Sequence, residues 1–215
     1  MKVVIIGATG FVGSALLKEL TNRGHLVTAI ARNVEGRTMP SVTWVAQDIR
    51  NTDRLVPVLT GHDVVISAYN AGWSNPNLYE DFLNGSRSIQ EAVTQAGVRR
   101  FIVIGGAGSL YTTDGQQIVD TPDFPETIRP GARAARDYLN VLKEEKQLDW
   151  VFFSPAIEMH PGVTIGRTGR YRLGKDYPVV DENGRSVLSV EDVAVVIADE
   201  VEKPGHHRER FTAAY

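Results

Sequence analysis

Three glycines near the start of the chain stand at a spacing that allows the backbone to bind phosphate. They belong to the run Gly7-Ala8-Thr9-Gly10-Phe11-Val12-Gly13, which follows a short apolar stretch and opens a segment with helical apolar spacing. A glycine turn between a strand and a helix lets the backbone approach a pyrophosphate, and the helix N-terminus favours its negative charge. The run therefore predicts a dinucleotide site formed by Gly7, Ala8, Thr9, Gly10, Phe11 and Val12.

The residues that end the next strands decide which dinucleotide is bound. Arg32 follows the second expected strand, where an acidic residue would accept hydrogen bonds from the ribose hydroxyls and repel a 2′-phosphate. A guanidinium there can grip the phosphate, so we expect NADP(H) as the preferred cofactor and NAD(H) as the alternative. Asp48 and Ile49 would lie beside the adenine, unless they only cap a loop. Ala68 and Tyr69 would run beneath the cofactor toward its nicotinamide.

Several aromatic side chains come from segments that can reach the carboxyl ends of the strands, where open α/β sheets bind ligands. Rings there could stack on a flat acceptor, although each one alone is better explained by packing. His160 lies beside a proline and has no neighbour at metal-ligand spacing, so no metal site is expected, and it also fits a surface residue. The candidate acceptor residues are Tyr69, Trp73, Tyr111, Tyr138 and His160.

Short β-branched runs alternate with amphipathic segments and would position these residues, as in a parallel sheet with crossover helices. The segment from 105 to 130 lacks periodicity and is longer than an ordinary connection, which is typical of a functional loop. The expected strands are Lys2–Ile6, Leu26–Ala31, Thr43–Ala46, Val64–Ser67, Arg100–Ile104, Trp150–Ser154 and Arg210–Ala214. The expected helices are Phe11–Arg23, Asp53–Leu59, Leu78–Ala96, Ala132–Lys146 and Val190–Glu202.

The segment after Pro155 has a different texture, with a hairpin expected around Tyr171–Val180 and Arg185–Leu188. We therefore expect an α/β fold with a doubly wound, mostly parallel Rossmann sheet and a small C-terminal extension on the substrate side. Residues 1–215 would form a single NAD(P)-binding domain, in which residues 155–215 contribute the cap on the acceptor side.

Composition narrows the class of protein further. The absence of cysteine excludes disulfides and thiolate chemistry, and fits a reducing cytoplasm. Acidic residues number 26 against 23 Lys and Arg, and no apolar run approaches a membrane span, so neither nucleic acid nor a membrane is an expected partner. The first residues read as a strand and not as a secretory signal. The chain would act as a monomer or a homodimer.

The motifs taken together resemble the atypical short-chain dehydrogenase/reductase family, in the NAD(P)H-binding group described as NADH-flavin reductases and related to biliverdin reductase B. The resemblance covers nearly the whole chain and implies a Rossmann fold, bound NADP(H) and, for some members, reduction of free flavin or related conjugated acceptors. It rests on Gly7 to Gly13, Arg32, Gly61 to Ser67, Gly105 to Leu110, Leu148 to Trp150, Ser154 to Ala156 and Ser189 to Ala194.

The catalytic residues of typical short-chain dehydrogenases are only partly matched. Those enzymes place Tyr and Lys four residues apart on one helix face, but here Tyr138 is followed by Leu142, and Lys143 lies one residue too far. One more residue rotates a side chain by roughly 100° around a helix, which argues against alcohol or ketone oxidoreduction. The resemblance places Ser109 at the active-site serine, where it is the candidate catalytic residue, although a serine in a glycine-rich loop also fits a turn.

These observations favour an NADPH-dependent reductase that transfers hydride to a flavin or another conjugated small molecule. Hydride transfer to a flavin needs mostly alignment, because the ring stabilises the added charge and solvent supplies the proton. The main alternative is a non-catalytic redox sensor that binds NADP(H) and acts through a protein partner. An isomerase or epimerase that keeps its nucleotide bound is a third interpretation.

Overall fold

One eight-stranded sheet forms the centre of the computed structural model, which describes residues 1–215. Its order is β3-β2-β1-β4-β5-β6-β8-β7, and neighbouring strands are parallel except for β7 with β8. The order reverses between β1 and β4, which creates the switch point of a doubly wound Rossmann sheet. The strands are β1 (Lys2–Ile6), β2 (Leu26–Ala31), β3 (Val42–Ala46), β4 (Val64–Ser67), β5 (Arg100–Ile104), β6 (Asp149–Ser154), β7 (Arg172–Gly174) and β8 (Glu209–Ala214).

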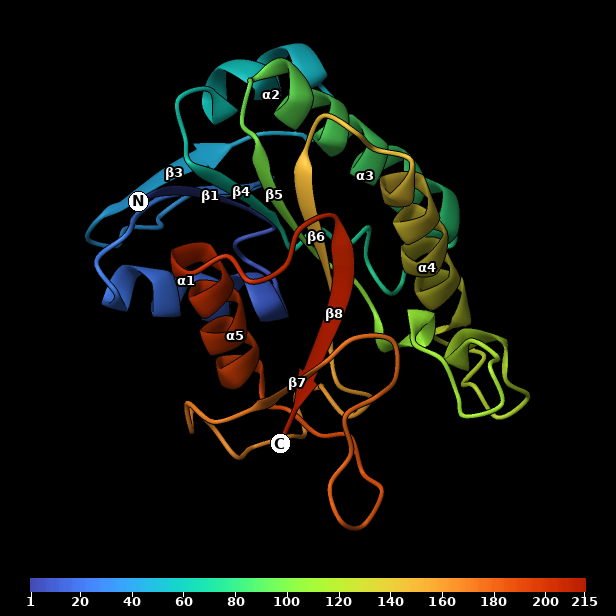
Figure 1. The fold of residues 1–215 in the computed structure, drawn as a ribbon. Helices are drawn as coiled ribbons and strands as arrows, with labels where there is room; N and C mark the ends of the chain where they lie inside the picture. Colours follow the sequence, from blue (N-terminus) through green and yellow to red (C-terminus); the bar gives the residue numbers. More distant parts are fainter.

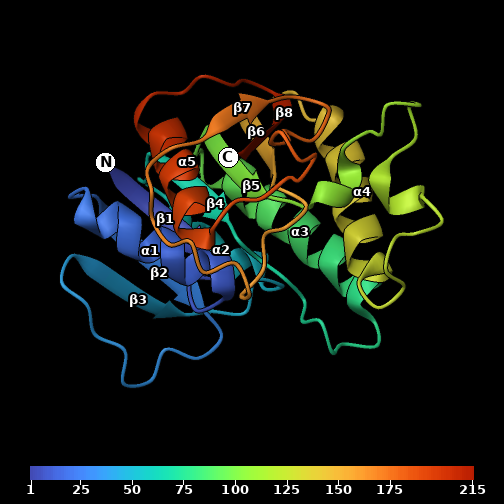
Figure 2. The ribbon, with the colours of Figure 1, turned by 90° about the horizontal axis from the view of Figure 1, so that it is seen from below.

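Helices cover both faces of this sheet, as Figure 1 and Figure 2 show. One face carries α1 (Phe11–Asn22) and α5 (Val190–Glu202), which pack against each other. The other face carries α2 (Thr52–Leu59), α3 (Leu78–Gln95) and α4 (Arg129–Lys143). The expected Rossmann architecture is therefore confirmed.

The central strands are apolar along their whole length because both of their faces are buried. In β1, Val3 and Ile5 belong to the core beneath α1 and α5, whereas Val4 and Ile6 belong to the core beneath α2, α3 and α4. Fully covered parallel strands read as continuous β-branched runs, and this explains why the sequence located them well.

The C-terminal segment differs from its expected form. The predicted hairpin between Tyr171–Val180 and Arg185–Leu188 is wrong, because β7 pairs with the last strand, β8, and Val187 makes only a single bridge to Glu158. The backbone groups of β7 that a local hairpin would use are paired with the edge of β8 instead. The segment after Pro155 therefore contributes two strands to the main sheet and one helix to its face, in addition to the loops at the sheet edge.

Helix α4 begins at Arg129, three residues before the expected Ala132. Pro130 explains the earlier start, because proline lacks only an N–H that the first helical turn leaves unpaired. The connection that precedes it contains two short 3₁₀ turns, η1 (Ala107–Ser109) and η2 (Ile118–Asp120).

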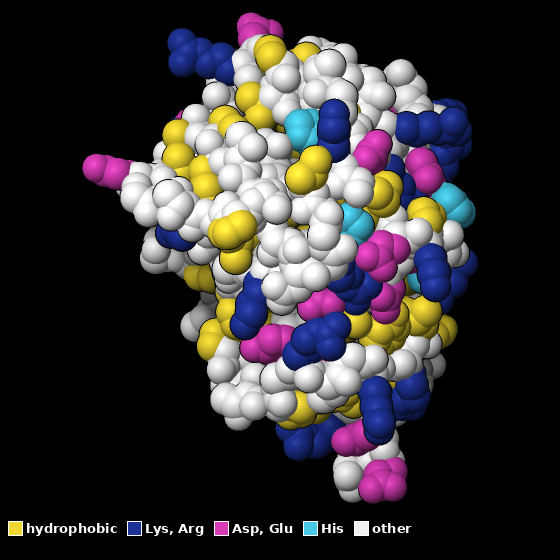
Figure 3. Space-filling model, turned by 90° about the vertical axis from the view of Figure 1, so that its left-hand side faces the viewer, with side chains coloured by type: hydrophobic (Ala, Val, Ile, Leu, Met, Phe, Trp, Pro, Cys, Tyr) yellow, Lys and Arg dark blue, Asp and Glu magenta, His cyan; other side chains and the backbone are white.

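Charged side chains are mixed on the face seen from the left of Figure 1, where basic and acidic groups alternate (Figure 3). This face therefore has no continuous basic surface of the kind that binds nucleic acid. None of the helices combines the length and the apolar composition that a bilayer crossing requires.

Candidate functional site

The glycine turn joins β1 to α1 at the switch point, and two of its glycines are required by the fold. Gly7 has a φ of +82°, and a Cβ on it would lie 2.5 Å from the Ala68 carbonyl oxygen. A Cβ on Gly13 would lie 2.1 Å from the Gly7 carbonyl oxygen, so α1 packs directly on the turn. The conformation of Gly10 suits any residue, and the nearest atom to its Cβ position would be Gly7 O at 3.3 Å. A side chain at Gly10 would therefore require a small shift of the turn, and the glycine leaves the exposed surface beside it open.

The first turn of α1 offers unpaired donors beside Gly10. No side chain caps this helix, and no acidic residue lies in its first turn. The amides of Gly7 and Ala8 donate to the Ile30 carbonyl and the amide of Gly10 donates to the Gly7 carbonyl, so the free N–H groups are those of Thr9 and the first helical residues. Unpaired amides and the helix dipole together attract an anion, as a pyrophosphate site requires. Thr9, Gly10 and Phe11 are exposed here, whereas Ala8 is buried.

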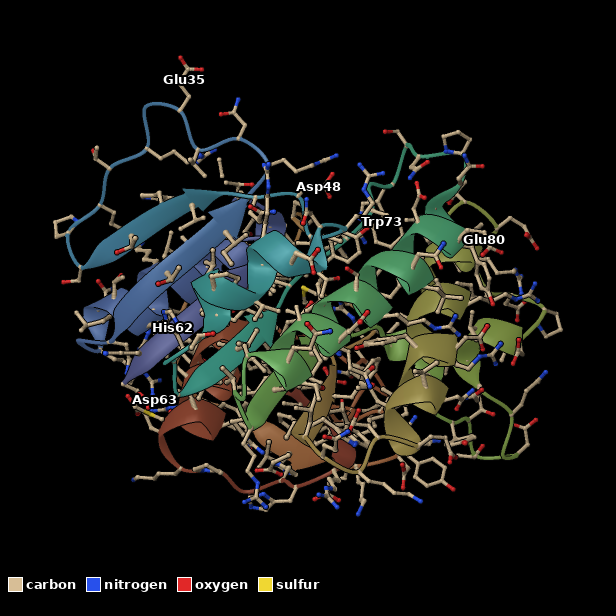
Figure 4. The ribbon with its side chains drawn as sticks, turned by 90° about the horizontal axis from the view of Figure 1, so that it is seen from above. Glu35, Asp48, His62, Asp63, Trp73 and Glu80 are labelled. Carbon is tan, nitrogen blue, oxygen red and sulfur yellow. The ribbon has the colours of Figure 1, made fainter.

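Two arginines lie at the end of the sheet where the adenine is expected. Arg32 is exposed directly after β2, and its charge acts on both Asp48 and Tyr69. Arg50, which sequence reasoning missed, donates to Asp48 at 2.7 Å, and this bond followed by the charge of Arg32 lowers the pKa of Asp48. Figure 4 shows Asp48 just beyond the strand tips, on the edge opposite His62 and Asp63. The edge therefore presents two cations beside the Asp48 carboxylate, and the charge of Asp81 also acts on Arg50 and Tyr69.

The other residues predicted to bind the cofactor are less exposed to solvent. Ile49 is buried in the core beneath α2 and α3, so only its neighbour Asp48 is exposed at this position. Tyr69 is half-buried and stacks on Phe82 with ring centroids 5.8 Å apart, and burial raises the pKa of its hydroxyl. Ala68 is half-buried directly behind Gly7, as its proximity to the Gly7 Cβ position shows.

Ser109 follows β5 at the nicotinamide end of the site, but its hydroxyl faces inward. The residue is 1% exposed, and the hydroxyl bonds to the Gly106 carbonyl at 3.0 Å and to Ser154 Oγ at 2.8 Å. Its carbonyl accepts hydrogen bonds from Gln117 and Arg210. These bonds hold the loop after β5 against β6 and β8, so a catalytic role would require the hydroxyl to exchange partners.

Trp73 is a predicted acceptor residue that the structure leaves open to solvent. It is 61% exposed on the segment between β4 and α3, on the same edge as Asp48 (Figure 4). Its ring lies over the start of α4, where a Cβ on Gly131 would lie 2.8 Å from it and 3.0 Å from Leu78. Gly131 therefore lets the indole lie against the helix. A fixed, exposed indole at this edge is suited to stacking on a flat molecule.

The structure separates the other predicted acceptor residues. Tyr138 is 1% exposed between α3 and α4, where its hydroxyl donates to Gln90 and burial raises its pKa far above the ordinary value. This contradicts its expected contact with an acceptor: the apolar face of α4 turns it into the core. Tyr111 lies over Arg210 and near Tyr177, on another pocket. His160 is exposed, and its Nδ1 accepts from the Gly162 amide at 3.1 Å.

Two buried carboxylates hold the loop that follows β6 against the sheet domain. Asp192 of α5 accepts hydrogen bonds from the Thr168 and Gly169 amides and from the Tyr215 hydroxyl. Burial opposes the charge of Asp192, but these bonds outweigh it and lower its pKa. Glu19 of α1 pairs with Arg167 of the same loop at 2.8 Å. Ser189 caps α5 by accepting a hydrogen bond from the Asp192 amide.

The fold and this site define a dinucleotide-binding Rossmann protein of the atypical short-chain dehydrogenase/reductase type. The family model described as NAD(P)H-binding matches residues 7–204, and the chain belongs to this NAD(P)H-binding family. A nicotinamide dinucleotide is therefore its cofactor, and the family supports an oxidoreductase in general.

Individual relatives are similar to this chain over nearly their full length. The uncharacterized protein YwnB of Bacillus subtilis is 35% identical over 99% of this chain and 97% of its own. A Bacteroides thetaiotaomicron structure provisionally described as an epimerase is 47% identical, with a TM-score of 0.90 over 100% of this chain and 96% of the other. A Streptococcus pneumoniae structure provisionally described as an NADH-flavin reductase is 35% identical, with a TM-score of 0.85 over 100% and 99% of the two chains.

Proposed function

We propose that this protein is an NADPH-dependent reductase that passes hydride to a flavin or another flat, conjugated small molecule. The observation that carries the proposal is the combination of an uncapped α1 N-terminus with two arginines and one exposed indole on a single sheet edge. The bound dinucleotide supplies the hydride, and the acceptor takes up that hydride together with one proton from solvent.

The residues of this chain would bind and align the two reactants. The free amides around Gly10 hold the pyrophosphate, and Arg32 with Arg50 holds the 2′-phosphate. The charges of both arginines act on Asp48. Its ion pair holds the Arg50 side chain in place until a phosphate competes for the guanidinium. Trp73 offers its exposed ring to the acceptor. Alignment of this kind supplies the main catalytic effect for a reaction that needs no strong acid or base.

The buried position of Tyr138 argues against an epimerase or alcohol dehydrogenase. Such reactions remove a proton from a hydroxyl and need a positioned base of suitable pKa. Tyr138 is inside the core with a raised pKa and no lysine four residues on, so it does not meet that need. A flavin reductase is free of this requirement, in keeping with the Streptococcus pneumoniae relative.

The test is to mix NADPH with the protein and either FMN or riboflavin, and to follow the near-ultraviolet absorbance of NADPH. We expect consumption that depends on both the protein and the flavin, and slower consumption by Trp73→Ala with unchanged NADPH affinity. NADPH binding without consumption by any conjugated acceptor would favour the sensor that acts through a protein partner.

A further inference from the structure

A second pocket lies beside the loop that follows β5, away from the glycine turn. It has a volume of about 530 Å³ and is lined by Trp150, by Arg208 to Arg210, and by Tyr111 with Tyr177. Trp150 is the second residue of β6 and Glu209 the first of β8, so the pocket lies toward the amino ends of these parallel strands. The glycine turn lies at the carboxyl ends. This β6–β8 pocket is therefore separate from the glycine turn.

Two of the side chains that line the β6–β8 pocket carry a donor atom that is buried beneath the pocket surface and has no hydrogen-bond partner. Trp150 is 2% exposed and its indole Nε1 is unpaired, and Arg210 is 7% exposed with an unpaired Nε. Both groups only donate hydrogen bonds, so a partner must be an acceptor. Buried donors without acceptors are uncommon and cost free energy, and a ligand recovers that cost only where the side chains shift to expose them.

The charges around the β6–β8 pocket select an anion. Four basic and two acidic side chains line it, so its net charge is positive. Lys175 pairs with Glu209 at 2.5 Å and Arg210 pairs with Asp176. Arg208 donates only to the carbonyls of Leu148 and Lys146, and Lys143 forms no ion pair. Two positive charges are thus left without a carboxylate.

Aromatic rings form the remaining walls and indicate a flat ligand. Tyr111 and Tyr177 face each other at a tilt of 55°, with ring centroids 6.4 Å apart, and Arg210 lies 5.2 Å from the Tyr111 ring centroid. Tyr177 is exposed, so its ring is free to move onto a molecule that enters. Ring contacts of this type favour an aromatic ligand over an aliphatic one of equal charge.

We propose that the β6–β8 pocket is a binding site for a small aromatic carboxylate. The carboxylate would bind beside Lys143 and Arg208, the two cations without a carboxylate partner, and the ring would lie against the exposed ring of Tyr177. Arg210 also donates to the Ser109 carbonyl, so the pocket shares a residue with the loop that follows β5. The site does not depend on the reductase proposal and binds its ligand without the dinucleotide.

The experiment is a titration of the ¹⁵N-labelled full chain with benzoate, without cofactor, observed through the indole N–H resonances. The chain has three tryptophans, whose signals are assigned with Trp→Phe variants. We expect a saturable shift of the Trp150 signal and none at Trp44. Benzamide has the same shape without the charge and should bind at least about tenfold more weakly. Cyclohexanecarboxylate, which has the charge without the flat ring, should also bind more weakly.

Surface variants keep the test independent of folding. Tyr177→Ala should weaken benzoate binding about two- to tenfold, and Lys143→Gln up to about fivefold. Lys18→Gln removes the same charge from α1, on the other face of the sheet, and should have no effect. The proposal is overturned if the Trp150 signal shows no saturable shift, if benzamide binds as tightly as benzoate, or if Lys18→Gln acts like Lys143→Gln.

Discussion

Reversing the charge of Arg32 should convert the cofactor preference from NADPH to NADH. Arg32 is exposed and unpaired at the end of β2, so the substitution Arg32→Asp leaves no broken contact in the fold. A charge-assisted hydrogen bond contributes about 1.5–3 kcal/mol, which corresponds to an affinity loss of about 10- to 150-fold for NADPH. NADH has only hydroxyls at this position and should bind as well as before or better.

The assay is calorimetric measurement of both dissociation constants at fixed ionic strength, because exposed charge pairs weaken with salt. Arg50→Ala should cost NADPH less than Arg32→Asp, since Arg50 must first leave Asp48. Arg99→Asp is the matched control, because Arg99 is exposed just before β5, at the opposite edge of the sheet. A wild type that prefers NADH, or an equal loss of both cofactors in Arg32→Asp, would refute the reasoning.

Three further predictions concern single side chains. Hydrogen bonds from Arg167 and then Arg23 lower the pKa of Glu19 to about 2 against the effect of burial, so the free energy of unfolding should fall as the pH drops from about 4.5 to 2. Urea unfolding of Glu19→Gln should show no such acid dependence and a loss of about 1–3 kcal/mol at neutral pH. Ser109→Ala should slow flavin turnover less than about tenfold at unchanged cofactor affinity, and a loss of about 10²- to 10⁴-fold would make Ser109 a proton donor. Tyr138→Phe should leave turnover unchanged, and a large loss in steady-state kinetics would return Tyr138 to the active site.

The sequence located the dinucleotide half of the fold well because local signals and tertiary packing agree there. The run from Val3 to Ile6 is apolar because both faces of β1 are buried, and the glycines that follow are needed where α1 packs on the turn. The residues of that turn could therefore be placed without knowledge of their distant neighbours.

The remaining features depend on contacts between distant segments. Strand β7 has only three residues and pairs with β8 some forty positions later, so no local periodicity reveals it. Arg50 reaches the adenine end only because β3 lies beside β2. The inward direction of the Ser109 hydroxyl depends on Ser154, which β6 brings next to it. Tyr138 is the exception, because Leu142 lies four residues after it, on the same face of the helix, and both are buried.

The central claim, that the glycine turn binds the dinucleotide pyrophosphate, is tested most directly by calorimetry of NADPH with Gly10→Val. Gly10 has an ordinary backbone conformation, and its Cβ position lies 3.3 Å from the Gly7 carbonyl oxygen, so a small shift of the turn should let the variant fold with a loss of about 1 kcal/mol as a poorer helix cap. The valine side chain would occupy the place of the pyrophosphate. We predict an NADPH affinity at least about tenfold lower, a difference of about 1.4 kcal/mol. Unchanged NADPH affinity in a folded Gly10→Val variant would contradict the account.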